Sequence, residues 1–380
     1  MFDDRALSLA IDNAGLPGVV ALVSDRDRTL YARAFGRANV LTGAAMAVDS
    51  VCQIASMTKA VTAVAALICV ARGQLALDTP IADVLPALAA PQVLTGFGPD
   101  GAAQLRPAAR PITLRHLLTH TAGFGYAFVQ PEVARWVLAH PAVPGTRAAL
   151  DLPLLFDPGD RWAYGISSDW VGLAVEAVSG QPLDAFMAAH IFAPLGMTAT
   201  AFRSAQTMPP DAAAVHARVP GGALVPVPIH LGGGDYAGGG GGLSGTAEDY
   251  ARFLRMILNG GRVGETRLLP PDLAAALLTN QVGALRAGQM TSAMPDLASP
   301  FDLLPDQHCG WSLAGLINPA PGPNGRSAGS LAWAGIFNSY YWADPARGLA
   351  GVFLTQLVPF ADAGALSAFG AFERMAYARA

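Results

Sequence analysis

Two short runs near the beginning of the chain carry the pattern of a β-hairpin. Residues 18–23 are apolar or small, residues 29–35 are mostly apolar, and residues 24–28 between them are all polar. Apolar runs of this length on either side of a polar turn are typical of paired strands. The sequence therefore predicts two neighbouring strands here.

A second pair of such runs lies near the end of the chain. Residues 331–342 are rich in aromatic side chains, residues 343–348 include Asp, Pro and Gly, and residues 349–357 are again mostly apolar. The pattern predicts one strand on each side of a turn. The last twenty residues, 361–380, are predicted to form a helix.

The pattern changes between about residues 76 and 234, where helix-like segments alternate with loops rich in proline and glycine and strand-like runs are few. Strands at both ends with helices between them predict an α/β fold in which residues 1–75 and 235–380 form one domain. Residues 76–234 are then an inserted, mostly helical domain. We expect the active site at the junction of the two.

Composition narrows the class of partner. The 380 residues carry a net charge of -4, with 52% hydrophobic and 14% charged side chains and no basic cluster, which excludes nucleic acid as a predicted partner. The acidic beginning lacks the features of a signal peptide, and no run reaches the roughly 18 apolar residues of a membrane span. Three cysteines without metal spacing suit a reducing compartment. We expect a cytoplasmic protein that acts on small molecules and does not bind membranes. Because charged side chains are few, its surface could also support a homo-oligomer.

One basic residue stands apart from the others. Lys59 is the only lysine, because every other member of the Lys+Arg total of 24 is arginine. An amine can lose its proton where a guanidinium cannot, so a single retained lysine is a candidate general base. Ser56 lies three residues earlier, and the apolar run 60–70 predicts a helix that places both side chains on one face. The S-x-x-K pair therefore predicts a lysine-activated serine nucleophile, the alternative being a chance spacing.

A different serine also lies in a motif of catalytic type. Residues 325–329 match G-x-S-x-G around Ser327, but that motif needs a histidine later in the chain, and the last histidine is His308. The proline-rich residues before it predict a loop and not a strand entering a helix. We therefore interpret this motif as a coincidence.

Two further patterns have structural alternatives that we favour. His116 and His120 have the spacing of a metal-binding pair, but the glutamate of H-E-x-x-H is leucine here, so we interpret them as structural. The glycine tract 232–242 lacks the G-K-[ST] of a phosphate-binding loop. It is predicted to be a flexible or tightly packed loop before a helix with Thr246 as N-cap.

A nucleophilic serine also needs an oxyanion hole and a proton donor. Tyr164 could be the proton donor, and the segment Trp333-Ala334-Gly335 could bring backbone close to a ligand. Taken alone, a tyrosine or a W-x-G segment is more often part of the core or of a turn. Together, S-x-x-K at Ser56, Tyr164-Gly165-Ile166 and Trp333-Ala334-Gly335 resemble, in order and separation, the three motifs of the penicillin-recognising serine hydrolases. Residues 113–123 and 242–250 extend the likeness to class C β-lactamases, family VIII carboxylesterases and related acyltransferases over nearly the whole chain.

The resemblance implies a β-lactamase/transpeptidase-like fold, with a mixed, mainly antiparallel sheet flanked by helices. It implies Ser56 as nucleophile, Lys59 as its base and Tyr164 as the general acid/base. It also implies an oxyanion hole formed by the N–H groups of Ser56 and Ile336, and no metal or cofactor. The predicted substrate-binding residues are Trp333, Gly335 and Tyr236. Other aromatic residues that could line an acyl pocket, or simply pack in the core, are Phe124, Tyr126 and Phe337.

Two departures from the family pattern bear on the substrate. β-Lactamases of this class have the motif Y-x-N, whose asparagine is replaced here by Ile166. They also have the motif K-T-G, whose lysine is replaced here by Trp333. Loss of a charge-assisted hydrogen bond to substrate costs roughly 1.5 to 3 kcal/mol, so an uncharged ester is favoured. The segment after Tyr164 looks like those of esterase B-type carboxylesterases and fungal statin acyltransferases. The prediction is a carboxylesterase or acyltransferase, with a β-lactamase, a DD-peptidase or a non-catalytic acylatable sensor as alternatives.

Overall fold

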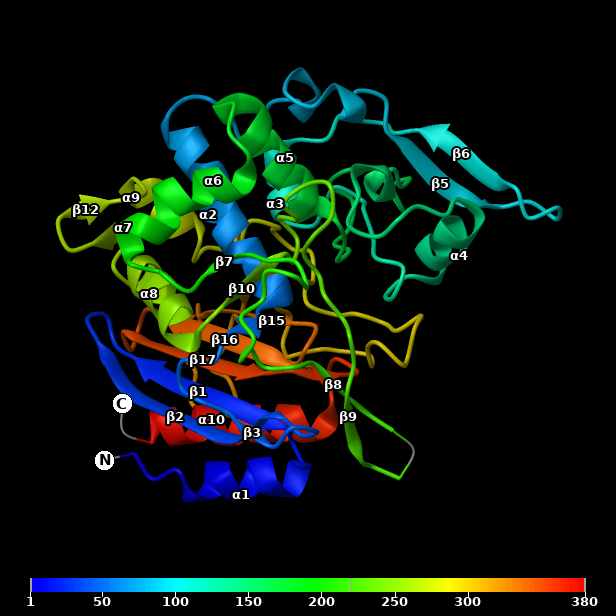
Figure 1. Ribbon diagram of the computed structural model, residues 1–380. Helices are drawn as coiled ribbons and strands as arrows, with labels where there is room; N and C mark the ends of the chain where they lie inside the picture. Colours follow the sequence, from blue (N-terminus) through cyan, green and yellow to red (C-terminus); the bar gives the residue numbers. More distant parts are fainter. Residues whose placement is uncertain (1, 220, 379–380) are drawn as a thin grey trace.

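An eight-stranded antiparallel sheet forms the centre of the protein, as the computed structural model shows for residues 2–219 and 221–378 (Figure 1). Each strand pairs with its neighbours in antiparallel register. In spatial order the strands are β13 (Gly310–Trp311), β14 (Leu316–Ile317), β15 (Leu331–Gly335), β16 (Ser339–Asp344), β17 (Leu349–Thr355), β1 (Gly18–Ser24), β2 (Thr29–Asn39) and β3 (Ala44–Ala45).

The two ends of the chain meet in the middle of this sheet. Strand β1 pairs with β17 from Val19 opposite Thr355 to Ser24 opposite Ala350, and every residue of both strands is buried. Burial on both faces explains why these runs are continuously apolar and do not alternate. Helices α1 (Arg5–Ala14) and α10 (Ala363–Tyr377) cover one face, and α8 (Ala247–Leu258) covers the other (Figure 1).

The predicted single strand over residues 331–342 is wrong, because a turn divides it into β15 and β16. Asn338 lies at this turn with a left-handed backbone, φ 61°. Its side-chain amide donates to the carbonyls of Leu357 and Pro359, at 2.9 and 2.8 Å, which holds the turn in place. The turn brings Ile336 to the end of the sheet that faces Ser56.

The middle of the chain contains helices and also strands that the sequence pattern did not predict. A hairpin of β5 (Gln92–Phe97) and β6 (Ala103–Pro107) projects from the body of the molecule (Figure 1). Strand β8 pairs in parallel with β18 near the end of the chain, so its conformation depends on a distant partner. The domain boundaries expected at 75/76 and 234/235 stay a prediction. The other elements here are α3 (Leu114–Leu118), α4 (Pro131–Ala139), α5 (Ser167–Ser179), α6 (Leu183–Met187), α7 (Ala193–Leu195), β7 (Ala201–Phe202), β8 (His216–Arg218), β9 (Leu224–Pro226), β10 (Leu243–Gly245) and, from the end of the chain, β18 (Leu357–Val358).

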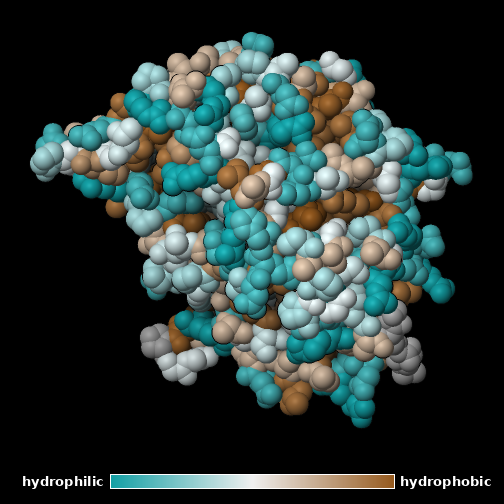
Figure 2. All heavy atoms as spheres, turned by 180° about the vertical axis from the view of Figure 1, so that it is seen from behind, coloured by the Kyte–Doolittle hydropathy of each residue, from teal (hydrophilic) through white to brown (hydrophobic). Residues whose placement is uncertain are grey.

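Helix α2 (Thr58–Ala71) runs through the centre of the molecule and packs against α5. All but its last two residues are buried, which accounts for its uninterrupted apolar sequence. In residues 2–219 and 221–378 no helix has the length and apolar character needed to cross a membrane. Figure 2 shows apolar side chains spread between polar ones over one face of the surface, in keeping with the low fraction of charged residues.

Candidate active site

Ser56 lies in a single turn of 3-10 helix, η1 (Ala55–Met57), that continues into α2. The residue before it, Ala55, has a left-handed backbone with φ 48°, a conformation that costs free energy for a residue with a Cβ atom. Two contacts hold this turn: Tyr250 donates its hydroxyl to the Met57 carbonyl at 3.0 Å, and β15 passes close by. A Cβ atom at Gly335 would lie 2.5 Å from the Ile54 carbonyl oxygen, so glycine is required there.

Lys59 points at Ser56 from the first turn of α2, as the spacing predicts. Its Nζ atom lies 3.2 Å from Ser56 Oγ, 3.1 Å from the Tyr126 hydroxyl and 2.6 Å from the Gly240 carbonyl oxygen. A carbonyl can only accept, so one N–H of Lys59 is committed to Gly240. A neutral amine then has one N–H for Tyr126 and its lone pair for the Ser56 hydroxyl. This arrangement is the one a general base requires.

Tyr164 meets Lys59 through its ring and not through its hydroxyl. The Lys59 Nζ atom lies 4.8 Å from the Tyr164 ring centroid, while the Tyr164 hydroxyl accepts a hydrogen bond of 3.0 Å from Trp333 Nε1. Both aromatic residues are buried. Trp333, predicted to contact substrate, therefore also holds the Tyr164 hydroxyl in place. Because this hydroxyl accepts from Trp333, its own proton is free to point elsewhere.

Tyr126 is a close partner of Lys59 that the sequence analysis named only as one of several aromatic residues. Burial, followed by the nearby Asp169 carboxylate, raises the pKa of Tyr126 well above its usual range, so its hydroxyl keeps its proton. No sequence pattern predicts this contact, because 67 residues separate Tyr126 from Lys59 and only the fold brings them together.

Asp169 is a second residue that sequence reasoning missed. It lies in the first turn of α5 and is buried, with its Oδ1 atom accepting the Gly240 N–H at 3.0 Å and its carboxylate bonded to the Tyr236 side chain. Burial raises the pKa of Asp169, and Lys59 and these hydrogen bonds oppose that rise. Burial also raises the pKa of Tyr236, as does the charge of Asp169. Tyr236, predicted to contact substrate, thus also bonds to this carboxylate.

Ser56 lines two small hollows. A slot of about 20 Å³ and a chamber of about 210 Å³ share Ser56, Phe128 and Ile336 as walls. Among the described residues that line them, Asp169 is the only one with a charged side chain. The slot is otherwise walled by Tyr164, Met290, Trp333, Ala334, Gly335 and Phe360, and the chamber by Tyr126, Gly145, Leu231, Tyr236 and the glycine tract. The structure thus brings all predicted site residues around one serine.

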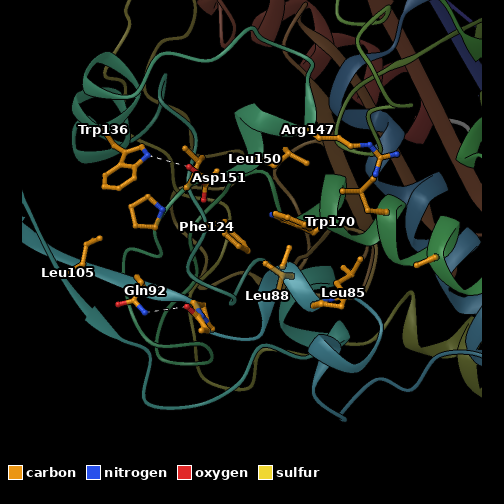
Figure 3. A pocket seen from close by; sticks show the side chains of 18 of the residues that line it. Leu85, Leu88, Gln92, Leu105, Phe124, Trp136, Arg147, Leu150, Asp151 and Trp170 are labelled. Carbon is orange, nitrogen blue, oxygen red and sulfur yellow. Dashed lines mark hydrogen bonds between the residues drawn. The ribbon is translucent and has the colours of Figure 1, made fainter.

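A larger cavity of about 800 Å³ lies along α5 and does not include Ser56. Figure 3 shows Trp136, Phe124 and Trp170 among its walls. Phe124 and Trp170 stack with ring centroids 6.3 Å apart. Trp170 follows Asp169 in the chain, so neighbouring residues of one helix line the two spaces. The charged side chains Arg147 and Glu176 of this cavity bond to each other at 2.9 Å.

The other candidate motifs have structural roles. Ser327 lies in a loop, as predicted, where its backbone N–H donates to Asp344 and the neighbouring Arg326 pairs with the buried Glu373. His116 completes the cap of α3 with Thr113, while His120 is buried among aromatic rings. Burial, followed by the charge of Lys59, lowers the pKa of His120 well below its usual range.

The glycine tract is tightly packed, which is one of the two forms predicted for it. A Cβ atom at Gly239 would lie 2.6 Å from the Ser168 carbonyl oxygen, and one at Gly242 would lie 2.7 Å from the Phe202 ring. Thr246 caps α8, with its side chain accepting from the Asp249 N–H. In the part of the chain that the structure describes, no group of three or more His, Cys, Asp or Glu residues could hold a metal ion.

Comparisons with known proteins cover nearly the whole chain. The Beta-lactamase family model matches residues 4–372. Lovastatin esterase of Penicillium rubens is 33% identical over 376 residues, which cover 93% of this chain and 92% of the esterase. Monacolin J acid methylbutanoyltransferase of Aspergillus terreus is 31% identical over 399 residues, covering 99% and 95%. The solved structure of unliganded simvastatin synthase from Aspergillus terreus has a TM-score of 0.84 at 28% identity, covering 99% of this chain and 97% of that one.

Proposed function

The chain belongs to the Beta-lactamase family, and from this premise we propose that it is a serine carboxylesterase that hydrolyses or transesterifies small-molecule carboxylic esters. The observation that carries the proposal is the contact of 3.2 Å between Ser56 Oγ and the amine of the only lysine in the chain. An esterase and an acyltransferase are among its relatives, and both chemistries pass through the same kind of acyl-enzyme.

Acylation begins when Ser56 Oγ attacks the ester carbonyl carbon and gives its proton to the Lys59 amine. The N–H groups of Ser56 and Ile336 stabilise the oxyanion, which is supported by the position of Ile336 beside Ser56 in both hollows. When the intermediate collapses, the bond to the alcohol oxygen breaks and Tyr164 donates a proton to that oxygen. The products of this half are acyl-Ser56 and the free alcohol.

Deacylation returns each proton to its source. Tyr164, now a phenolate, takes a proton from a water or an acceptor alcohol, whose oxygen attacks the acyl carbon. Lys59, now an ammonium, gives its proton back to Ser56 Oγ as the acyl bond breaks. The ammonium lies 4.8 Å above the Tyr164 ring, and Trp333 donates to the phenolate oxygen, so both charges of the intermediate have a stabilising partner.

The walls of the site support an uncharged substrate. The residues that line the two hollows include no cation that would attract a carboxylate, and Trp333 stands where a penicillin-recognising enzyme has lysine. The chamber of about 210 Å³ has room for only one bulky part of an ester, and the slot of about 20 Å³ adds little space to it. We therefore propose esters with a short acyl group or a bulky alcohol. A β-lactamase, DD-peptidase or sensor function has no such support.

Replacement of the base tests this function. Lys59→Arg replaces an amine that can lose its proton with a guanidinium that cannot, so hydrolysis of p-nitrophenyl butyrate should fall by about 100-fold or more. Steady-state rates would be compared after circular dichroism has shown that both proteins are folded. In parallel, mass spectrometry of the acid-quenched wild type should find butyryl on the peptide that holds Ser56. Equal rates, or butyryl on Ser327, would overturn the proposal.

A further inference from the structure

The Gly240 residue lies between a buried acid and the proposed base. Its N–H donates to Asp169 at 3.0 Å, and its carbonyl accepts from Lys59 Nζ at 2.6 Å. The three residues therefore form a continuous hydrogen-bonded chain from the first turn of α5 to the first turn of α2. Ser56 lies at its end, 3.2 Å from the Lys59 amine.

The absence of a side chain at position 240 makes this chain possible. A Cβ atom at Gly240 would lie 2.4 Å from Asp169 Oδ2 and 3.0 Å from its Cγ atom, so any other residue would displace the peptide or the carboxylate. The preceding glycine is equally constrained, because a Cβ atom at Gly239 would lie 2.6 Å from the Ser168 carbonyl. The glycine tract therefore packs directly against Ser168 and Asp169 in the first turn of α5, and these contacts fix its position.

The charges around Asp169 fit a role in the proton transfer. The groups that act on it are Lys59 from α2, Tyr236 from the glycine tract and the Tyr126 hydroxyl, which itself feels the Asp169 charge. Lys59 gains a positive charge when it takes the Ser56 proton, and a buried carboxylate nearby stabilises that charge strongly because little water screens it. Burial raises the pKa of Asp169, and the charge of Lys59 and the hydrogen bonds from Gly240 and Tyr236 act against that rise in favour of the charged form.

We propose that Asp169 is a positioning residue for Lys59. Through the Gly240 peptide it holds the amine on Ser56, and by its charge it stabilises the ammonium of the acyl-enzyme. This inference rests on the proposed esterase function, and it gives the glycine tract a purpose in the reaction. It also explains why a carboxylate is buried five residues after Tyr164, at the edge of a site whose walls are otherwise uncharged.

Asp169→Asn tests the role of the charge, because asparagine can keep both contacts: its oxygen accepts from Gly240 and its amide donates to the Tyr236 oxygen. We expect kcat/KM for p-nitrophenyl butyrate to fall on the order of 100-fold. The acid limb of the pH profile should move to lower pH by about one unit, since an ammonium without its counter-charge loses its proton more readily. Asp249→Asn is the matched control, because Asp249 is also buried and holds the backbone of Ala199 at 2.8 Å and the Thr200 hydroxyl at 2.9 Å.

Two glycine substitutions give a second test that keeps Asp169. Gly240→Ala should lower kcat/KM on the order of 100-fold by moving the peptide off Lys59. Gly370→Ala is the control and should change it little, because Gly370 lies in α10, lines neither hollow at Ser56, and a Cβ atom there meets nothing closer than the Asn324 side chain at 3.2 Å. The inference is wrong if the acid limb of the pH profile lies at the same pH in Asp169→Asn and Asp249→Asn. It is also wrong if the two alanine variants have the same kcat/KM.

The rate at which a fluorophosphonate labels Ser56 separates failure of this inference from failure of the proposed function. This reagent needs an activated serine but no matching ester. Labelling that is fast in the wild type and about 100-fold slower in Asp169→Asn supports the inference. If the wild type is labelled or turns over esters, and Asp169→Asn is labelled at the same rate, the inference is wrong but the proposed function stands. A wild type that is neither labelled nor active overturns both.

Discussion

The two cavities beside α5 differ in what their walls hold. The chamber at Ser56 is about a quarter the size of the cavity at Trp136 and Trp170, roughly 210 against 800 Å³. Yet the smaller space adjoins a chain of buried hydrogen bonds through Lys59 and Asp169, whereas the charged pair of the larger one, Arg147 and Glu176, is partly exposed. Buried polar groups with fixed partners, and not volume, therefore distinguish the space where we propose that the chemistry takes place.

The difference also separates two kinds of mutational effect. Around Ser56, the loss of one polar atom disturbs the position or the charge of the next, so the rate should respond far more than the stability. Around the larger cavity, side chains contribute mainly contact area, so changes there should leave the chemistry alone. Three substitutions, in order of decreasing effect, test this contrast.

The largest effect is expected for Ser56→Ala, which removes the proposed nucleophile. Turnover of p-nitrophenyl butyrate should fall by about four orders of magnitude or more, to the uncatalysed background. Ser327→Ala is the control, because Ser327 is a serine in a catalytic-looking motif but lies in a loop held by Asp344. Retention of full activity by Ser56→Ala, or its loss in Ser327→Ala, would break the contrast.

A smaller and more selective effect is expected for Tyr164→Phe. For ethyl butyrate, kcat/KM should fall by about 100-fold, because ethoxide needs a proton to leave and we propose that Tyr164 supplies it. For p-nitrophenyl butyrate the loss should be much smaller, since p-nitrophenolate leaves without a proton and kcat/KM reports acylation. Equal losses with the two esters would mean that Tyr164 acts only by shaping the site around Trp333.

The smallest effect is expected in the larger cavity. Leu105 lines that cavity and is 43% exposed, so Leu105→Trp should partly fill the space at little cost in stability. Hydrolysis of p-nitrophenyl butyrate should stay within about twofold of the wild type, and the thermal midpoint should barely move. A tenfold fall in kcat/KM would show that the larger cavity takes part in substrate binding, and the contrast would need revision.

Sequence alone predicted those parts of the site that depend on local geometry or on the family motifs. The contact between Ser56 and Lys59 follows from helical spacing, and the resemblance named Tyr164, Trp333 and Ile336. It could not predict that Trp333 donates to Tyr164, which lies 169 residues away, because this bond depends on how β15 packs against the middle of the chain. The roles of Tyr126 and Asp169 were missed for the same reason.

The fold shows the same division between local and distant causes. The apolar runs at both ends were predicted as strands because a continuous run of apolar residues indicates a buried strand. The turn at Asn338 was missed, since its left-handed backbone depends on the carbonyls of Leu357 and Pro359. Strand β8 was missed because its partner, β18, lies near the other end of the chain.

The pairing of β1 with β17 joins a strand that is synthesised early to one that is synthesised late. Ribosomes add roughly 5 to 20 residues per second, so β1 waits on the order of tens of seconds for its central partner. Ser56 and Lys59 are made early, but β15 and the Ile336 turn arrive only near the end. A chain cut before β15 would therefore carry the proposed nucleophile without the strand proposed to complete its oxyanion hole, and we expect activity only once β15 to β17 have left the ribosome.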